Sequence, residues 1–260
     1  MIESHDYTII HNESIAENMY KLSIYAPDIS SMAIPGQFVQ IKIPNRQDLI
    51  LRRPISINYT DTNSGIVELV YQIVGAGTKI LSTLTSGNTL NVLGPLGQGF
   101  DIADAKNVYL VGGGCGVAPL RFISKKWPHL KVDAFLGFRS LSSVYQREEF
   151  TNTSEKVFLA TEDGSLGNAG YVTDLVAMEL KNDKPDLILA CGPMPMLKII
   201  QGLVKKHNIP CQISLEERMG CGIGGCLVCS CAIGKENWWQ YKRVCADGPV
   251  FRSEEVLWDV

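Results

Sequence analysis

The 260-residue chain has no long apolar run, no excess of charge of one sign and no low-complexity segment. No stretch approaches the roughly 20 apolar residues that a helix needs to cross a bilayer, so we expect no membrane contact. The net charge of −3 and the lack of a basic run give no electrostatic footprint for nucleic acid. Residues 1–6 contain neither the basic nor the apolar segment of a secretory signal. We therefore expect a globular protein of the reducing cytoplasm.

Cysteine, in contrast, is concentrated near the C-terminus. The spacing Cys221-x4-Cys226-x2-Cys229, followed by the distant Cys245, is the ligand pattern of plant-type 2Fe–2S clusters. Each iron of such a cluster is tetrahedral and shares two bridging sulfides, so four protein thiolates complete the two irons. The interleaved glycines let the loop turn sharply and bring backbone N–H groups close to sulfur. The pattern predicts a 2Fe–2S cluster and therefore the transfer of single electrons.

Other interpretations of the cysteines stay open. Structural zinc also uses four cysteines, but its usual signature is two paired knuckles, and here the fourth ligand stands alone. Disulfides would suit an even number of cysteines, although they do not suit the expected compartment. Cys191 and Cys211 lie in apolar strand-like runs that favour inert burial. Cys231 could replace Cys229 as a ligand, but the x2 spacing favours Cys229.

The first hundred residues alternate between strand-like runs and turn formers such as Pro35-Gly36. Only Thr78–Leu84 has the pattern of a short helix. This rhythm predicts that residues 1–101 form a small antiparallel six-stranded β barrel. The expected strands are Tyr7–His11, Tyr20–Tyr25, Gln37–Ile43, Leu49–Asn58, Ile66–Val74 and Thr89–Leu93.

After Asp101 the chain alternates between apolar strands and helices, which predicts an α/β domain with a parallel sheet over residues 102–215. Ligands of such sheets bind at the carboxyl ends of the strands. From Glu216 onward the glycine and cysteine content predicts a third, small iron–sulfur module over residues 216–260. The expected strands are Asn107–Val111, Val132–Phe138, Lys156–Ala160, Leu187–Cys191 and Cys211–Leu215, and the expected helices include Ala118–Lys126, Thr173–Leu180 and Met194–His207.

A glycine-rich segment follows the first strand of the α/β region and precedes a helix. Glycine at such a turn lets the backbone approach a pyrophosphate held at the helix N-terminus. Val117 breaks the G-x-G-x-x-G fingerprint, so a tight turn without a ligand is an equal alternative. The glycines are Gly112, Gly113, Gly114 and Gly116.

Two segments are candidates for the adenosine ribose of a dinucleotide. Asp133 lies at about the usual distance downstream of the glycines, but it begins its strand and is expected at the opposite edge of the sheet. Arg139 and Ser140, just beyond the end of that strand, are better placed. A single arginine is sparse for a doubly charged 2′-phosphate, so we predict NAD rather than NADP.

Adjacent arginines occur within an apolar strand-like run at Arg52 and Arg53. In a strand their side chains point to opposite faces. One guanidinium could clamp a phosphate, for which its planar fork is suited. Alternatively, both are solvated residues of an edge strand that Pro54 marks.

Several motifs occur in the order typical of the ferredoxin–NADP reductase superfamily. They are Arg53-Pro-Ile-Ser56, Gly77-Thr78, Gly94-Pro-Leu-Gly-x-Gly-Phe100, the triple glycine with Ala118-Pro119, and Cys191-Gly-Pro193. The C-terminal tail indicates a particular family within this superfamily. Its segments Met219-Gly-Cys-Gly-Ile-Gly-Gly-Cys-Leu-Val-Cys and Val244-Cys-Ala-Asp-Gly-Pro-Val-Phe251 are similar to those of the electron-transfer subunits of bacterial type B dihydroorotate dehydrogenases. The resemblance spans essentially the whole chain.

This resemblance implies FAD at the barrel, NAD at the parallel sheet and a 2Fe–2S cluster in the tail. Ile55 departs from the superfamily, where many members have a tyrosine, and Cys115 stands where an aliphatic residue is expected. The implied flavin contacts are Arg53, Pro54, Ile55, Ser56, Val70, Tyr71, Gln72, Gly77 and Thr78. The implied nucleotide contacts are the four loop glycines with Cys191, Gly192 and Pro193, and the implied cluster ligands are Cys221, Cys226, Cys229 and Cys245.

The resemblance also implies the activity. Electrons would pass from an FMN-containing, dihydroorotate-oxidising subunit through the cluster and FAD to NAD, in pyrimidine biosynthesis, with two copies of each chain. Hydride transfer between stacked rings needs alignment more than an acid or base, so we name no catalytic residue. One alternative is a related subunit serving a sulfite reductase, a hydrogenase or a ferredoxin-linked transhydrogenase; transhydrogenase-like relatives carry Asp in place of Cys221. A second alternative is a non-enzymatic module with a zinc-binding tail.

Overall fold

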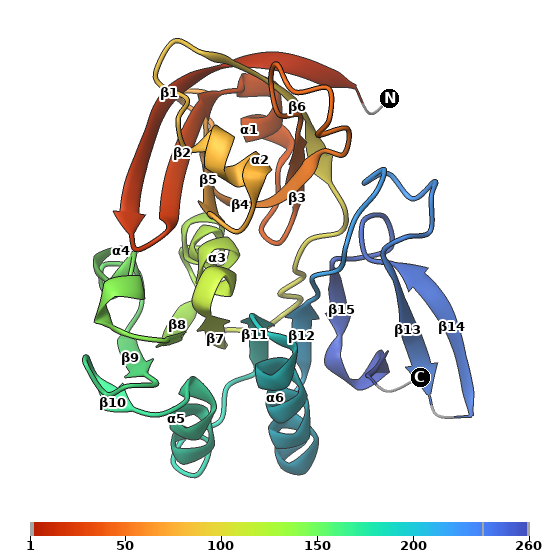
Figure 1. The fold of residues 1–260 in the computed structure, drawn as a ribbon. Coiled ribbons are helices and arrows are strands. Elements are labelled where there is room, and N and C mark those ends of the chain that lie inside the picture. Colours follow the sequence, from red (N-terminus) through yellow and green to blue (C-terminus); the bar gives the residue numbers. More distant parts are fainter. Residues whose placement is uncertain (1–2, 236, 259–260) are drawn as a thin grey trace.

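The computed structural model describes residues 3–235 and 237–258, and its N-terminal part is a closed barrel of six antiparallel strands (Figure 1). Apolar side chains that alternate along the strands, such as Leu22, Ile24 and Leu69, fill the barrel and are fully buried. This confirms the predicted barrel. Around the barrel the strand order is β1 (Ser4–Ala16), β2 (Met19–Tyr25), β5 (Ile66–Gln72), β4 (Arg53–Asp61), β3 (Phe38–Ile41) and β6 (Thr89–Leu96).

Two details of the barrel differ from the prediction. A second short helix, α1 (Pro27–Met32), accompanies the expected helix α2 (Ala76–Leu81). It was missed because Ile29 is its one buried apolar side chain, and the Pro27-Asp start with two serines resembles a turn. The strand expected over Leu49–Asn58 begins only at Arg53, and the apolar residues before it are exposed: Ile50 by 83% and Leu51 by 56%.

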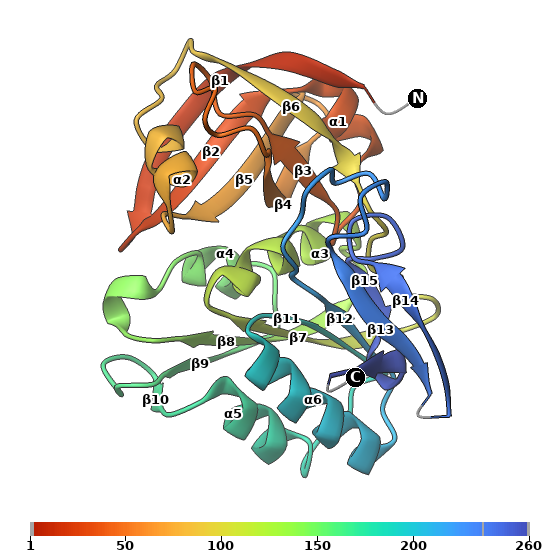
Figure 2. The same ribbon diagram turned by 45° about the vertical axis from the view of Figure 1, so that its right-hand side comes forward.

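The central part is a seven-stranded sheet that is parallel except for its last strand. Helices α5 and α6 cover one face, and α3 and α4 lie on the side of the barrel (Figure 2). The predicted parallel sheet is therefore confirmed. The order is β10 (Asn168–Ala169), β9 (Lys156–Thr161), β8 (Lys131–Phe138), β7 (Asn107–Gly113), β11 (Leu187–Cys191), β12 (Cys211–Ser214) and β15 (Val250–Arg252), and the α-helices are α3 (Arg121–Lys126), α4 (Arg147–Thr151), α5 (Val172–Glu179) and α6 (Met194–His207).

The helix expected over Ala118–Lys126 is divided. A 3-10 helix, η1 (Gly114–Leu120), leads directly into α3, and Pro119 lies inside η1. Proline removes a backbone donor that a regular α-helix uses, which accounts for the later start of α3. None of the helices in the described part of the chain is both long and apolar enough to cross a membrane.

The C-terminal tail joins the central sheet instead of standing apart from it. Its strand β15 pairs antiparallel with β12 at the sheet edge. The tail also forms a three-stranded sheet in the order β14 (Trp238–Arg243), β13 (Ser230–Lys235) and β16 (Val256–Leu257). Buried residues of the tail, including Cys229 and Cys245, share one hydrophobic core with Phe38 of the barrel and with the central sheet. The cysteine loop is therefore packed against both other parts of the molecule.

Candidate cluster, flavin and nucleotide sites

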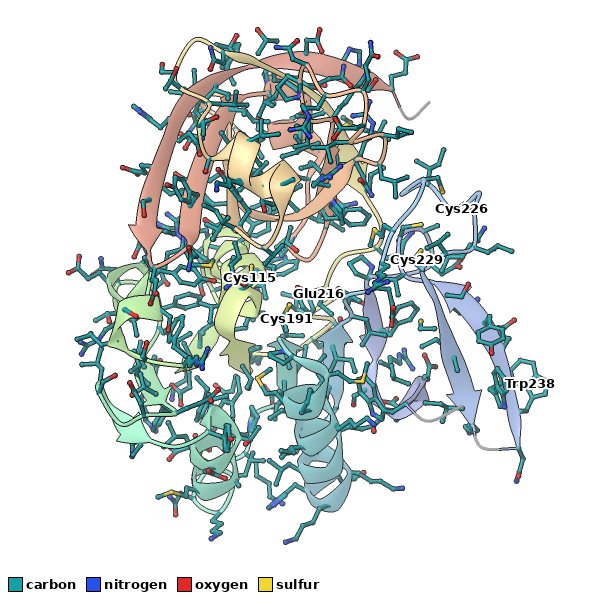
Figure 3. The ribbon with its side chains drawn as sticks, viewed as in Figure 1. Cys115, Cys191, Glu216, Cys226, Cys229 and Trp238 are labelled. Atoms are coloured by element: carbon teal, nitrogen blue, oxygen red, sulfur yellow. The ribbon has the colours of Figure 1, made fainter. Side chains whose placement is uncertain are left out.

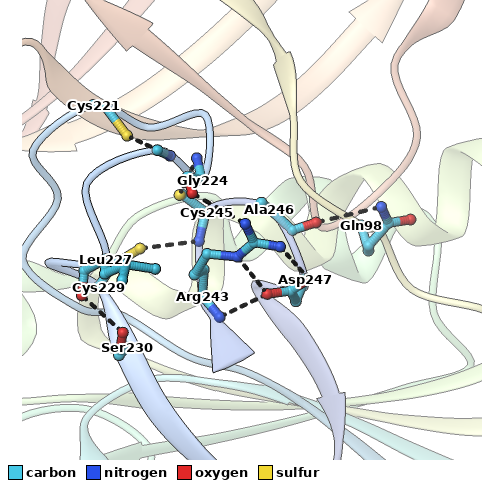
Figure 4. A network of polar contacts seen from close by, with 11 residues as sticks. Gln98, Cys221, Gly224, Leu227, Cys229, Ser230, Arg243, Cys245, Ala246 and Asp247 are labelled. Atoms are coloured by element: carbon cyan, nitrogen blue, oxygen red, sulfur yellow. Dashed lines mark hydrogen bonds and ion pairs between the residues drawn. The ribbon is translucent and has the colours of Figure 1, made fainter. Parts of the chain in front are cut away.

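Backbone N–H groups donate to all four predicted ligand sulfurs of the tail. Figure 4 shows the contacts at Cys221, Cys229 and Cys245. N–H donation to sulfur stabilises the thiolate and adjusts the redox potential of a bound cluster. The loop thus places its own dipoles where a cluster would carry negative charge. The donor–acceptor pairs are Gly225 to Cys221 Sγ (3.2 Å), Cys221 to Cys226 Sγ (3.3 Å), Gly224 to Cys245 Sγ (3.2 Å) and Cys245 to Cys229 Sγ (3.4 Å).

The four sulfurs are arranged as two pairs. The Cys221 N–H donates to Cys226 Sγ, which joins these two cysteines, and the Cys245 N–H donates to Cys229 Sγ, which joins the other two. Among residues 3–235 and 237–258, no three His, Cys, Asp or Glu side chains converge as the ligands of one metal ion do. A 2Fe–2S cluster needs two thiolates at each of two irons. The paired arrangement fits that requirement.

Glycine makes room for this loop. Gly222 and Gly224 have φ angles of +74° and +83°, which favour glycine. A Cβ at Gly222 would approach the Gln40 side chain of the barrel to 2.5 Å, and one at Gly220 would lie 3.0 Å from Cys226 Sγ. The space that a cluster and its ligands need is thus kept free by missing side chains.

An ion pair between Arg243 and Asp247 supports the cysteine loop. The Arg243 guanidinium donates to the two carboxylate oxygens of Asp247 at 2.8 and 3.0 Å, and to the Gly224 carbonyl at 3.0 Å. The ion pair with Arg243 lowers the pKa of Asp247 to about 2. Arg243 also places a cation near Cys245 and Cys229. The ion pair therefore joins the two ends of the ligand set and offsets their negative charge.

The surroundings of the thiols shift their pKa values in different directions. Burial would raise the pKa of Cys221, but hydrogen bonds from Ile223, Cys226 and Gly225 outweigh it and lower the pKa to about 6. In Cys231, burial raises the pKa to about 12. Cys231 lies within β13 and packs against the central core. None of the eight cysteines forms a disulfide.

The two adjacent arginines have separate surroundings. Arg52 donates to the carbonyls of Gln40 and Asn91, both at 3.2 Å, and so joins neighbouring barrel strands. Arg53 lies against the start of α2, where a Cβ on Gly77 would sit 2.3 Å from Arg53 Nε. Arg53 also donates to the Leu51 carbonyl. Arg53 is therefore the guanidinium placed beside a helix N-terminus, where a phosphate is favoured.

The other predicted flavin residues divide into exposed and buried groups. Pro54 and Gln72 are exposed, whereas Val70 and Tyr71 are buried. The Tyr71 ring stacks on Tyr20 inside the barrel. Any contact from Tyr71 to a flavin would therefore come from its backbone. Ile55 and Ser56 are half-buried, and Gly77 and Thr78 are buried in the first turn of α2, where Thr78 Oγ1 accepts the Val74 N–H at 3.0 Å.

The glycine loop and the Cys191–Pro193 turn are packed against each other. A Cβ at Gly113 would meet Met196 and Pro193, and one at Gly116 would lie 2.3 Å from the Cys191 carbonyl oxygen. Similarly, Gly112 faces Val117 and Gly192 faces Met196, so these glycines serve close packing. Gly114 differs: its φ is +54° and nothing lies within 4 Å of its Cβ position. Of these glycines, Gly114 alone opens onto free space that a ligand could fill.

Three titratable groups gather where the barrel meets the carboxyl edge of the sheet: Cys115, Cys191 and Glu216 (Figure 3). The Glu216 residue keeps an exposed surface, but the protein around its carboxyl partly desolvates this group and raises its pKa. Burial raises the pKa of Cys115 to about 12. The Tyr145 hydroxyl donates to the Gly114 and Cys115 carbonyls at 3.0 and 3.2 Å. Sequence reasoning missed Glu216 and Tyr145 because no local motif marks either residue.

A closed flavin-type barrel, a parallel nucleotide-type sheet and a cysteine loop between them define a class: flavin- and nicotinamide-dependent reductases with an iron–sulfur centre. Residues 6–100 match the oxidoreductase FAD-binding domain and residues 110–202 the oxidoreductase NAD-binding domain. Residues 216–257 match the iron–sulfur cluster binding domain of dihydroorotate dehydrogenase B. A cytochrome P450 reductase from Amycolatopsis has the same fold, with a TM-score of 0.67 at 21% identity over 80% of this chain and 68% of the other.

Curated relatives then identify the family. The chain is 41% identical over 263 residues to the dihydroorotate dehydrogenase B (NAD(+)) electron transfer subunit of Bacillus caldolyticus, covering 99% of this chain and 100% of the relative. It is 42% identical to the subunit of Enterococcus faecalis, covering 96% and 97%, and 39% identical to that of Desulforamulus reducens, covering 94% and 95%. The chain belongs to this family of electron transfer subunits. The predicted cofactor classes, FAD, NAD and an iron–sulfur cluster, are confirmed by the matching domains.

Proposed function

We propose that this chain takes electrons from a dihydroorotate-oxidising subunit and delivers them to NAD, as a step of pyrimidine biosynthesis in the cytoplasm. The observation that carries this proposal is the pairing of four N–H-bonded sulfurs in a tail that is packed on the barrel and the sheet at once. A bound flavin exchanges either one or two electrons and so links a one-electron cluster to a two-electron nicotinamide. The named relatives act in dihydroorotate dehydrogenase B, which supports this assignment.

The chain's own residues would hold and align these groups. Cys221, Cys226, Cys229 and Cys245 would bind the cluster, and Arg53 would hold the FAD phosphates beside α2. The open position at Gly114 would admit the pyrophosphate of NAD close to η1. Alignment of the two rings at the barrel–sheet junction would then permit hydride transfer without a protein acid or base. The three functional parts would correspond to residues 1–101, 102–215 and 216–260.

The partner would carry the substrate site. Three apolar side chains beside the ligand cysteines are exposed: Ile223 by 53%, Leu227 by 63% and Val228 by 57%. Such exposure suits burial against another subunit, and electrons would cross at this place. We propose an FMN-containing dihydroorotate dehydrogenase subunit as the partner, with two copies of each chain.

A second candidate function has one specific observation in its favour. The structure described as an NADH-dependent reduced ferredoxin–NADP oxidoreductase resembles this chain with a TM-score of 0.87 and 34% identity, over 97% of this chain and 90% of the other. A related reductase subunit that serves a ferredoxin-linked partner is therefore the alternative. Cys221, which supplies a fourth thiolate, favours the dihydroorotate assignment.

Reconstitution distinguishes the two candidates. Dihydroorotate-dependent reduction of NAD is measured with this chain alone, with the partner subunit alone and with both together. We expect full activity only from the pair, because the substrate site and the nucleotide site lie on different chains. Full activity from the partner alone, or none from the pair while another dehydrogenase copurifies with this chain, would transfer the assignment to the related reductases.

A further inference from the structure

The inference concerns the choice between NAD and NADP, and it rests on the proposed function. The pyrophosphate would lie near Gly114, at the end of β7, and the nicotinamide must reach toward the barrel that holds the flavin. Strand β11 lies on one side of β7, and strands β8 and β9 lie on the opposite side and run parallel to β7. Since ligands lie across the carboxyl ends of such strands, the adenosine ribose falls over the loops that follow β8 and β9.

Those two loops form one connected rim. The Asp163 N–H donates to the Arg139 carbonyl at 3.3 Å, and the Leu141 N–H donates to Ser165 Oγ at 2.7 Å. Within the rim, the hydroxyls of Ser140 and Ser142 lie 3.0 Å apart. The rim thus offers several short polar groups at the position expected for a ribose.

A residue of the flavin barrel completes this rim. Glu17, in the turn between β1 and β2, donates its N–H to the Ser142 carbonyl at 2.9 Å, and its Oε2 accepts the Ser142 hydroxyl at 2.5 Å. The turn is held in place because Ile15, Ala16 and Met19 pack into the core of the nucleotide-binding part. The Glu17 carboxylate is therefore fixed across the domain boundary.

The charge of the rim suits a ribose diol and disfavours a phosphate. Glu17, Glu162 and Asp163 are all exposed carboxyl-bearing residues here, and Arg139, after β8, contributes a cation. The hydrogen bond from Ser165 lowers the pKa of Asp163, so this carboxyl remains ionised at neutral pH. A carboxylate accepts hydrogen bonds from ribose hydroxyls, as acidic residues do in NAD-specific sheets, whereas a 2′-phosphate brings like charge.

We infer that Glu17, a residue of the flavin barrel, is a specificity-determining residue that excludes NADP by placing its carboxylate beside the 2′-position of the adenosine ribose. The domain that binds the flavin thereby sets the choice of nucleotide made by the neighbouring domain.

The test uses the FAD- and cluster-loaded chain and follows reduction of a dye by NADH and by NADPH. Glu17→Gln removes the charge but keeps the length and an acceptor for Ser142. Glu13→Gln is the matched control, because Glu13 lies in β1 shortly before the turn that carries Glu17, is exposed and pairs with Lys21 at 2.9 Å. A Glu17→Lys variant reverses the charge.

We expect Glu17→Gln to raise kcat/KM for NADPH roughly 3- to 10-fold and Glu17→Lys to raise it further, while NADH changes by less than about 2-fold. The Glu17 variants should also lose part of the dependence of the NADPH KM on ionic strength, which a purely structural role would not affect. An unchanged NADPH-to-NADH ratio, or an equal fall with both nucleotides, overturns the inference. A wild-type chain that oxidises neither nucleotide would instead contradict the proposed function itself.

Discussion

At the scale of single residues, Arg52 and Arg53 have opposite roles although they are neighbours. Arg52 is held by Gln40 and Asn91, the latter through Nη2 and Asn91 Oδ1 at 2.5 Å. Arg53 lies against Gly77 at the first turn of α2. Arg52 precedes β4 and Arg53 begins it, so the two side chains have different surroundings: Arg52 links barrel strands β3 and β6, and Arg53 packs against α2.

Replacement of Arg53 tests its role as the FAD phosphate contact. A charge-assisted contact of this kind is worth about 1.5–3 kcal/mol, so Arg53→Ala should weaken FAD binding roughly 10- to 100-fold. Arg53→Lys should be intermediate, since it keeps the charge but not the fork. Flavin content and the dissociation constant from fluorescence titration provide the measurement. The control, Arg52→Ala, should lower stability and leave the flavin affinity of the folded protein unchanged; the reverse pattern would assign the phosphate to Arg52.

At the residue scale, sequence spacing was informative for the tail. The four cysteines selected by the x4 and x2 spacing lie in one loop region whose backbone N–H groups donate to their sulfurs, and their role as cluster ligands stays a prediction. Glu17 could not be found in this way, because its partner Ser142 lies 125 positions away along the chain. Its position depends on how two domains dock, and no local pattern encodes that docking.

At the scale of elements, the segment from Cys226 into β13 turns within a few residues from loop to strand. Leu227 has a φ of +60°, which non-glycine residues rarely adopt. Cys229 precedes β13, and its carbonyl accepts the Val244 N–H at 2.9 Å. Cys231 lies inside β13, opposite Lys242. The start of the strand therefore separates a cysteine of the loop from a cysteine of the sheet.

Serine substitution at these two positions tests that division. Serine is a hard ligand that is poorly matched to iron, so Cys229→Ser should lose most iron and acid-labile sulfide, whereas Cys231→Ser should keep both. The measurement is iron and sulfide per chain after anaerobic purification, with zinc determined in parallel. Loss of the cluster in Cys231→Ser with retention in Cys229→Ser would reassign the ligand, and stoichiometric zinc without sulfide would support the zinc alternative.

Elements with strong periodicity were predicted well, and short elements held by tertiary contacts were not. The β7–β8–β9 core follows from continuous apolar runs, as expected for a parallel sheet covered on both faces. Strand β15 is only three residues long and exists because β12 offers a free edge. Likewise, α1 is held by the burial of Ile29 against the barrel core, and its sequence shows no helical periodicity. Sequence pattern contains little information about such edges and contacts.

At the scale of the whole molecule, the barrel and the sheet are joined by a buried polar cluster. Asn58 is fully buried and donates to the Ala118 carbonyl at 2.8 Å, and it exchanges hydrogen bonds of 2.9 and 3.0 Å with the Gln146 amide. Arg121 donates to Asn58 Oδ1 at 3.1 Å and pairs with Glu68 of the barrel. Because these contacts lie beside η1, they fix how the flavin and nucleotide sites face each other.

Removal of the Asn58 amide should therefore lower the stability of the whole molecule and disturb the alignment of its two sites. Asn58→Ala leaves the Ala118 carbonyl, Gln146 and Arg121 without a shared partner in a buried place, and each such loss costs about 1–3 kcal/mol. We expect a decrease of roughly 2–4 kcal/mol in the free energy of unfolding, and a slower reduction of FAD by NADH at saturating nucleotide, because the rings are less well aligned. Urea unfolding followed by flavin fluorescence and circular dichroism measures the stability, and stopped-flow absorbance measures the rate of FAD reduction.

Asn63→Ala, at an exposed turn of the barrel, is the control and should change neither quantity. A variant that loses stability but keeps the wild-type rate of FAD reduction would show that the cluster holds the domains together without setting the alignment of the two sites.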